Sequence, residues 1–405
     1  MRVQGWFRPL TDERGAALPM ALFATAILIT LVIAFSILSS SEPTIAGNQQ
    51  SVAQARAIAE SGIERATWAL NNPTNGSGLA DPMPATVPAP YDGSAAVNVA
   101  LTSGTLGSFR VTVTPGAASN ERNVESVGTI PNDTSPRAKQ RIRVTVIKFK
   151  FLGPPAALSV RGELQVGGNT FIDARETGLA APDPHCGAGA KVGTFTTGTT
   201  EVQGGSADVY GRDGNNTRNE STDILQLQPT AVFDQYLLTD DDMAALKAYA
   251  KSQGTYYQGS VDFRSSNQMP NGIIFVDTVS GAPMSATSDP NDQANVAIRG
   301  GAAASPDGIF HGWLIVNGRL QIDGDFQMWG YGYVQNDLTY TGTGTGQIVG
   351  AMLSRNIQDA SFTTIDTNTG GNASIIYDCG KAMSGGGAVP QTYTVKGGTY
   401  KEVSE

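Results

Sequence analysis

The side chains best suited to chemistry are few in this chain. It contains two histidines, His185 and His311, and two cysteines, Cys186 and Cys379. A zinc site normally needs three or four His, Cys or carboxylate ligands. His185 beside Cys186 does not supply that number, so we predict no metal centre there and no bound cofactor.

Several aspartates lie in short, turn-like segments, and a polysaccharide lyase or hydrolase would need such groups to converge on one face. The candidates are Asp213, Asp289, Asp292, Asp323 and Asp325. Asp323 and Asp325 flank a glycine, and tight turns select Asp-Gly-Asp for their own geometry. The run at 240–242 fits the positive end of a helix. We therefore predict no enzymatic activity, although such loops also offer the oxygen ligands of a calcium site.

The two cysteines, at positions 186 and 379, lie far apart in the sequence. In an extracytoplasmic protein they would form a disulfide, which closes a long loop and removes entropy from the unfolded chain. The alternative is two buried free thiols. The sequence alone does not decide between them.

The net charge of −9 and the 48 glycines restrict the function classes. Nucleic-acid binding needs clustered Lys and Arg, whereas the main basic run, at 137–143, alternates as the solvated face of a strand does. We therefore predict no nucleic-acid partner and a turn-rich β protein. Trp313, Trp329, Tyr331 and Tyr333 would contact a sugar or pack in a core, and their alternation favours packing.

These residues must be positioned by elements that follow an apolar N-terminal segment. Residues 15–41 carry no charge, and 16–38 are apolar apart from three hydroxyl side chains. About 20 apolar residues cross the hydrocarbon core as a helix. Arginines before the span favour a cytoplasmic N-terminus, which places the body outside the cytoplasm. A cleaved signal peptide ending at 39–41 is the alternative, although its apolar region is typically about 7–15 residues long.

Apolar residues recur at helical spacing beyond the span. The stripe consists of Ile45, Val52, Ala59, Ile63, Ala66 and Leu70. Such spacings place side chains on one helix face. A single helix over 16–70 would be roughly 80 Å long, with a bend expected at Pro43. A plain signal anchor with a helical stalk would show the same periodicity.

Short motifs surround the span. Arg14-Gly15-Ala16-Ala17-Leu18 opens it, Ala46-Gly47-Asn48 follows it, and then comes Ala57-Ile58-Ala59-Glu60-Ser61-Gly62-Ile63-Glu64-Arg65-Ala66. In this order they resemble the N-terminal segment of PilX-type pilus assembly proteins. Those proteins are minor pilins, similar to the K-type minor pseudopilins of type II secretion.

The resemblance implies cleavage by prepilin peptidase after Gly15 and methylation of the new N-terminus at Ala16. It also implies that the long helix packs among other pilin helices. Major pilins carry Glu at the fifth mature position, where this chain has Met20, and PilX-type and K-type members also lack that Glu. Pro19 at the fourth position is unusual but fits a first helical turn.

We predict a mainly β protein behind this transmembrane helix. The expected units are a leader at 1–15, a transmembrane and assembly helix at 16–70, a linker at 71–90, a small antiparallel pilin-like β domain at 91–152, a parallel β-helix-like domain at 153–384 with a helical insertion near 239–252, and a loosely ordered tail at 385–405 with one strand at 392–395.

The β-helix prediction depends on an internal repeat. Segments beginning at Val160, Val316, Val334 and Leu353 realign with one another. Short apolar strands separated by Gly, Asn and Asp turns at a regular step are typical of stacked solenoid coils. An irregular antiparallel sandwich is the alternative.

Together these features predict a minor pilin or pseudopilin-like subunit of a type IV pilus or type II-like pseudopilus. Its expected partners are other pilin subunits, prepilin peptidase and the inner membrane, with the body outside the cytoplasm or at the cell surface. A membrane-anchored adhesive or carbohydrate-binding β-solenoid is the first alternative. A β-helical lyase or hydrolase using Asp323 or Asp325 is the second.

Overall fold

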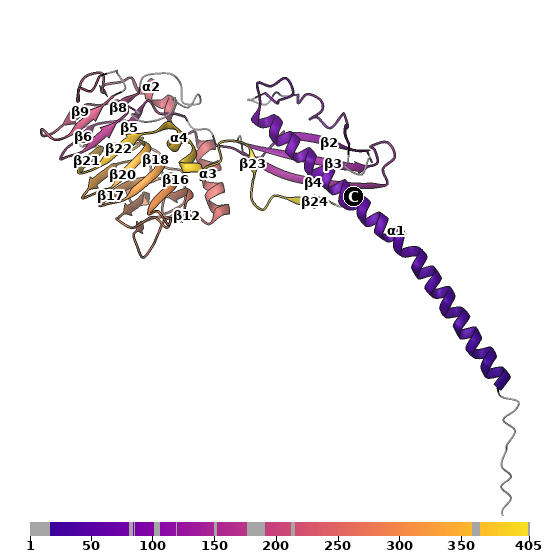
Figure 1. Ribbon diagram of the computed structural model, residues 1–405. Coiled ribbons are helices and arrows are strands. Elements are labelled where there is room, and N and C mark those ends of the chain that lie inside the picture. The colour runs from indigo at the N-terminus through magenta and orange to yellow at the C-terminus, as the bar shows by residue number, and fades with distance from the viewer. Residues whose placement is uncertain are drawn as a thin grey trace, which may run out of the picture.

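The computed structural model is mostly β, with one long helix at its N-terminal end (Figure 1). It describes residues 17–80, 84, 86–100, 106–118, 120–149, 152–175, 191–211, 215–358 and 365–403. Two hydrophobic cores hold this part of the chain together. One lies between the helix and an antiparallel sheet, and the other fills a body of parallel strands.

The helix α1 (Ala17–Asn71) is continuous over 55 residues, and Pro43 lies inside it. Figure 1 shows its first part standing clear of the molecule and its last part lying along a sheet. The helix ends just before Asn72-Pro73. This end is expected, because proline disfavours the helical conformation of the residue that precedes it.

The antiparallel sheet that the sequence predicts is present. Its strands lie in the order β1 (Val97–Ala100), β2 (Leu106–Pro115), β3 (Glu121–Ile130) and β4 (Ala138–Ile147). Each neighbouring pair is antiparallel. Alternate residues such as Val111, Val124 and Val144 are buried in the core shared with α1, because residues two apart on a strand share one face of the sheet.

The segment expected to be only a linker takes part in this core. Leu79 is fully buried, and its N–H donates to Ala69 O at 2.9 Å. Tyr91 is buried in the same core, and its hydroxyl donates to Ser77 O at 2.9 Å. Proline and glycine in this region therefore end the helix, but they do not prevent the chain from folding back onto it.

The C-terminal tail corrects a second expectation. Instead of one strand in a loosely ordered tail, β23 (Thr394–Val395) and β24 (Lys401–Val403) both pair with β4 in the antiparallel sense. The chain thus leaves the body and returns to the sheet beside α1 (Figure 1). The returning strands cover an edge of β4 that would otherwise be open to pairing with another chain.

Replacement of Asn71 by alanine is expected to loosen this tail. Asn71 Nδ2 donates to Tyr393 O at 3.1 Å, and Asn71 Oδ1 accepts from Tyr393 N–H at 2.6 Å. Losing these partners should cost about 1–3 kcal/mol and speed amide exchange across 390–403. Asn72→Ala is the control, because the Asn72 amide donates to Trp68 O within α1. Equal exchange rates in the two variants would contradict this role of Asn71.

The body contains two sheets whose neighbouring strands are parallel, one of eleven strands and one of seven in the described part of the chain. The larger sheet contains β5 (Ala156–Val160), β7 (Phe171–Asp173), β8 (Val192–Thr196), β10 (Asp208–Tyr210), β11 (Ile224–Leu225), β12 (Tyr256–Gln258), β14 (Gly272–Asp277), β16 (Ile309–Val316), β18 (Gln327–Val334), β20 (Gln347–Ser354) and β22 (Ser374–Tyr377). The smaller contains β6 (Leu164–Val166), β9 (Thr200–Val202), β13 (Val261–Phe263), β15 (Ala294–Ile298), β17 (Gly318–Asp323), β19 (Leu338–Gly342) and β21 (Thr367–Gly371).

From β12 to β22 the chain alternates between the two sheets, so each passage adds one strand to each of them. These passages stack in the order of the sequence, but the earlier strands β5 and β6 lie beside the last of them and not before the first. β5 pairs with β20, and β6 pairs with β21. The repeat copy at Val160 therefore lies next to the copy at Leu353, while the copies at Val316 and Val334 are direct neighbours.

Helices cover part of the larger sheet. They are α2 (Thr230–Phe233), α3 (Asp240–Gln253) and α4 (Cys379–Ser384), with single turns η2 (Asp234–Tyr236), η3 (Pro290–Asp292) and η4 (Gly385–Gly387). Thr239 and Asp242 form a reciprocal capping box at the start of α3. α3 packs on β14, and α4 packs on β18 and β20. Trp313 Nε1 of β16 donates to Ala382 O of α4 at 2.8 Å.

Candidate functional site

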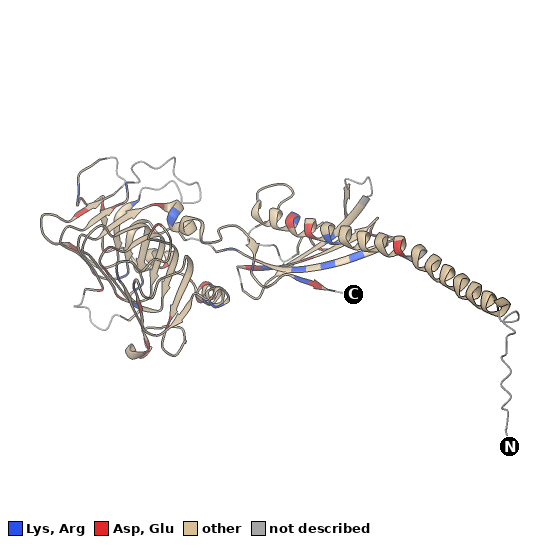
Figure 2. Cartoon of the chain, turned by 60° about the horizontal axis from the view of Figure 1, so that its bottom comes forward, with Lys and Arg blue, Asp and Glu red and all other residues tan. Residues whose placement is uncertain are grey.

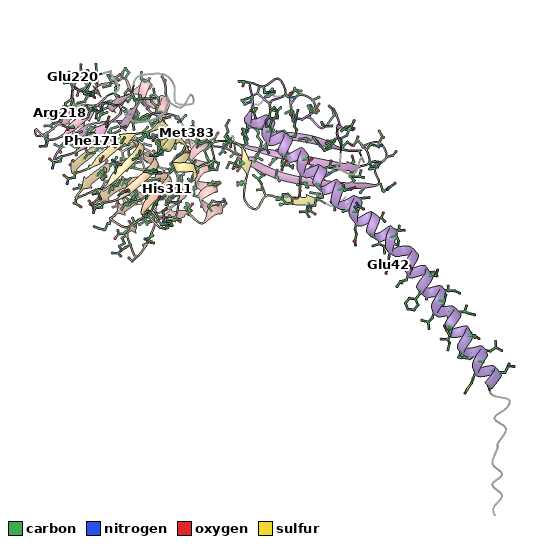
Figure 3. All side chains as sticks on the ribbon, viewed as in Figure 1. Glu42, Phe171, Arg218, Glu220, His311 and Met383 are labelled. Carbon is green, nitrogen blue, oxygen red and sulfur yellow. The ribbon has the colours of Figure 1, made fainter. Side chains whose placement is uncertain are left out.

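The most distinctive surface of the molecule is the free half of α1. Its large apolar side chains from Leu18 to Leu38 are all exposed, by 48% to 74%. The first charged residue along the helix is Glu42, which Figure 3 labels. Figure 2 likewise shows an uncharged helix up to this point. An apolar surface of this size needs another apolar surface to cover it.

The dimensions of this free half match a membrane span. The helix is long and apolar enough to cross a bilayer, and none of its most apolar stretch is buried. Its two threonine hydroxyls are satisfied within the helix: Thr25 Oγ1 donates to Ala21 O at 2.8 Å and Thr30 Oγ1 to Ala26 O at 3.1 Å. The span therefore contains few polar groups that would oppose entry into hydrocarbon.

The other half of α1 is docked on the antiparallel sheet. The buried face consists of Ser51, Ala55, Ile58, Ala59, Gly62, Ile63, Ala66, Ala69 and Leu70. This set differs from the stripe read from the sequence, because Ile45 and Val52 are 53% and 43% exposed. The apolar periodicity thus continues past the end of the sheet, onto the free part of the helix.

Small residues bring the helix and the sheet into close contact. A Cβ added to Gly128 of β3 would lie 2.1 Å from Ala55 O. A Cβ on Gly62 of α1 would lie 2.1 Å from Ser126 Oγ. Nothing in the sequence alone singles out either glycine as the point of this close approach. The small residues at 55, 59, 62 and 66 of α1, spaced three and four apart, were the available signal for this contact.

The C-terminal strand adds polar contacts to the docked helix. Arg56 pairs with Glu60 at 3.2 Å and with Glu402 of β24 at 2.9 Å, and Tyr400 Oη donates to Glu60 Oε1 at 2.9 Å. Hydrogen bonds to Tyr400 and then to Glu60 raise the pKa of Arg56. Arg56 is exposed, so these pairs contribute little stability. They position the tail on α1.

The processing residues Gly15 and Ala16 lie outside the described residues, and cleavage between them stays a prediction. Cys186 also lies outside them. Cys379, which begins α4, is 3% exposed and is disulfide-bonded. Cys186 is the other cysteine of the chain, and its pairing with Cys379 stays a prediction.

Reduction is expected to destabilise the body if these two cysteines pair. A native disulfide typically contributes about 2–4 kcal/mol, so the thermal midpoint should fall in dithiothreitol. Cys186→Ser should show the same lowered midpoint without reductant, and adding reductant should then change nothing further. An unchanged midpoint for the wild-type chain on complete reduction, verified by thiol counting, would contradict the pairing.

Two of the aspartates considered for catalysis, Asp323 and Asp325, lie at the end of β17 and just after it. Gln321 Nε2 donates to Asp323 Oδ2 at 2.8 Å, and Thr345 N–H donates to Asp325 Oδ1 at 3.0 Å. Gly324 between them has a φ of +80°, which suits glycine. Both carboxylates therefore accept hydrogen bonds where β17 ends and the chain turns.

The remaining polar candidates do not converge. Asp289 Oδ1 accepts from Asn291 N–H and Asp292 Oδ1 accepts from Ser280 N–H. Asp213 and His185 lie outside the described residues. Within the ranges that the structure describes, no group of three or more His, Cys, Asp or Glu side chains is placed to hold a metal ion.

His311 and Trp329 form a small cluster on the larger sheet. His311 Nε2 lies 2.9 Å from Asp307 Oδ2, and hydrogen bonds from Ser305, Ile309 N–H and His311 lower the pKa of Asp307 to about 2. Trp329 is half-buried against His311, with the Lys381 ammonium 4.0 Å from its ring centre.

The other aromatic residues singled out from the sequence are buried. Trp313, Tyr331 and Tyr333 are each no more than 2% exposed. The Trp313 and Tyr331 rings meet edge to face at 5.8 Å. These three side chains therefore pack in the core, as their alternation predicts, and do not form an exposed sugar platform.

No protein-family model matches the chain, and no curated protein sequence matches it. Among solved structures, the competence-associated pilin ComZ from Thermus thermophilus aligns over 88% of this chain and 98% of its own chain. The two share 11% sequence identity, with a TM-score of 0.25. A TM-score this low does not establish a shared fold.

Proposed function

We propose that this chain is a structural subunit of a type IV pilus or type II-like pseudopilus, of the PilX-like minor pilin kind. One observation carries the proposal: the two halves of α1 have different surroundings. The docked half lies on the sheet, while the free half exposes apolar side chains on all sides. A helix of this kind gains stability first in a bilayer and then among the helices of neighbouring subunits.

The proposed route begins with insertion in the inner membrane, with the leader cytoplasmic and the body outside. Prepilin peptidase then cuts after Gly15, and Ala16 becomes the methylated N-terminus. Met20 stands where a major pilin has a glutamate. Without that carboxylate, the subunit cannot neutralise the amino terminus of a neighbour, so we place it at the tip or in an initiation complex.

The body is the displayed part in this proposal. Its alternation between two parallel sheets supports a β-helix-like solenoid. We assign it no enzymatic role and no cofactor, because Asp323 and Asp325 accept hydrogen bonds at the end of β17 and in the turn after it. Calcium binding in its loops is a subordinate proposal, tested by a change of thermal midpoint on adding calcium and then chelator.

The deciding experiment is N-terminal sequencing of the subunit from sheared filaments. The proposal expects the chain in the filament fraction, with Ala16 as its first residue. A membrane-anchored adhesive solenoid unrelated to pili would instead remain with the membranes after shearing and keep its leader. A chain beginning near Glu42 would mean that the apolar segment is a discarded signal peptide.

A further inference from the structure

A groove lies on the antiparallel sheet, on the face that α1 does not cover. Its volume is about 560 Å³. Val113, Val124 and Val144 are buried in the core shared with α1, and successive residues of a strand face opposite sides. The residues next to these valines therefore lie on the other face, where β2, β3, β4 and the tail at 398–401 bound the groove. Figure 2 shows basic residues alternating along a strand of this sheet.

One row of side chains crosses the groove from β2 to the tail. Thr112 lies directly opposite Glu125, and Glu125 lies opposite Arg143. Arg143 in turn lies opposite Lys401 of β24. The next residue, Glu402, pairs with α1 and so faces the other side of the sheet. Lys401 therefore shares the groove face with Arg143, and two cations lie opposite each other on paired strands.

The positive charges of this row exceed the negative charge. Glu125 is the one acid among the described residues that line the groove. It pairs with Arg143, and Arg141 Nε also lies 3.6 Å from Glu125 Oε1. One carboxylate is thus shared by two arginines, while the Lys401 ammonium lies across from a guanidinium. Like charges directly opposite on paired strands are destabilising, so an anion between them would relieve a repulsion.

The cations of the groove are open to solvent and hence to a ligand. The Arg143 side chain is 54% exposed, and Lys401 is also exposed. Thr112 and Thr114 line the groove beside them with hydroxyl groups, which both donate and accept. The volume falls within the roughly 300–1,000 Å³ of small-ligand sites. The groove therefore has room for a molecule larger than a single ion.

We propose that this groove binds a small anionic ligand through a carboxylate or phosphate group held between Arg143 and Lys401. Arginine offers a planar fork of donors to such groups, and lysine offers a compact charge. The hydroxyls of Thr112 and Thr114 would contact the other polar groups of the ligand. This inference goes beyond filament assembly, because it assigns a ligand site to the sheet beside α1.

The bound anion would also fasten the tail. Arg143 belongs to β4 and Lys401 to β24, so an anion between them joins the two strands. The tail already contacts β4 next to this place, because Thr145 N–H donates to Thr399 Oγ1 at 3.1 Å. Binding should therefore slow amide exchange across 396–403.

Calorimetric titration of the full chain in micelles of a non-ionic detergent tests the proposal. The probes are glucuronate and inorganic phosphate, with glucose as the uncharged control. We expect at least one anion to bind with a dissociation constant of roughly 1 mM or below, and more weakly as NaCl is added. Binding of phosphate alone would identify a phosphate-bearing ligand, and binding of glucuronate alone a carboxylate. Binding of both would identify a general oxyanion site.

Two variants locate the binding. Lys401→Gln and Arg143→Gln each remove one cation, and each should weaken binding about tenfold or more. Lys401→Gln also separates binding from a structural role of the lysine. Without ligand this variant loses a repulsion, so its tail should exchange no faster than that of the wild-type chain. Adding the anion should then no longer slow the exchange.

The matched controls are Lys251→Gln and Arg264→Gln, which make the same changes of charge at exposed positions on the body. Arg264 also lies beside a carboxylate, 3.6 Å from Asp262 Oδ2. Each control should bind as the wild-type chain does. Failure of both anions to bind, or equal binding of glucose, would overturn the proposal. Undiminished binding by Lys401→Gln and Arg143→Gln would also overturn it, because the ligand would then lie elsewhere.

Discussion

Substitution of Gly15 by leucine is expected to leave the leader attached and to remove the subunit from filaments. The glycine stands on the amino side of the proposed cleavage point, where a bulky side chain would displace the scissile peptide in the peptidase. A misplacement of about 1 Å costs roughly 10²-fold in rate. The retained, charged leader would then keep the helix from leaving the membrane. Immunoblots of membrane and sheared-filament fractions measure both effects.

Gly5→Leu is the matched control, since it makes the same change within the leader but away from the cleavage point. It should be processed and incorporated as the wild-type chain is. If Gly15→Leu were also processed normally and found in filaments, the leader assignment would be wrong. Incorporation with the leader still attached would separate assembly from processing and would contradict only the cleavage step.

The second large effect is expected from Gly330→Ala in the body. Gly272, Gly312, Gly330 and Gly350 form a column across β14, β16, β18 and β20, opposite one another in register. Their φ values lie between +118° and +156°. A Cβ on Gly330 would lie 1.7 Å from Gly312 O, which is a backbone atom held by the sheet.

Neither strand can move away without breaking the parallel pairing, so we expect a loss of about 4 kcal/mol or more, a size seen for mutations with a specific structural cause. The thermal midpoint of the body should fall steeply, or the chain should fail to accumulate. The turn η4 also packs closely on this column, since a Cβ added to Gly385 would lie 2.6 Å from Gly312 Cα.

Gly272→Ala separates backbone strain from steric overlap. Gly272 belongs to the same column and has a positive φ, but nothing lies within 4 Å of its added Cβ. Only the strain remains there, at roughly 1–3 kcal/mol. Equal losses of stability for Gly272→Ala and Gly330→Ala would show that close packing of the column does not matter.

The features of this fold that depend only on residues close together in the sequence were predictable. The apolar run of α1 predicts a spanning helix, because composition and length suffice for that inference. Period-two alternation in β2, β3 and β4 predicts strands with one buried face. Thr239 and the aspartates after it predict the start of α3, because capping involves only the first turn.

The way α1 is divided into a docked half and a free half was predictable only in part, because it depends on elements that are distant in the sequence. Periodicity placed Ile45 and Val52 in the same stripe as Ala59, yet the sheet ends before it reaches them. The point at which the sheet no longer buries the helix depends on the length and position of the sheet. Asn317 showed nothing unusual in the sequence, yet its side-chain oxygen is buried without a hydrogen-bond partner among the described residues, which depends on the residues that stand beside it in the fold.

The sequence by itself determined that the chain has an apolar helix, an antiparallel sheet and repeated short strands, because each follows from local composition and period. Only the tertiary structure decided that the first repeat copy stacks on the last and that the tail returns to β4. The physical reason is that similar repeat copies offer similar strand edges for hydrogen bonding. The choice among such edges depends on the closure of long loops and on the packing of whole elements, which no local pattern records.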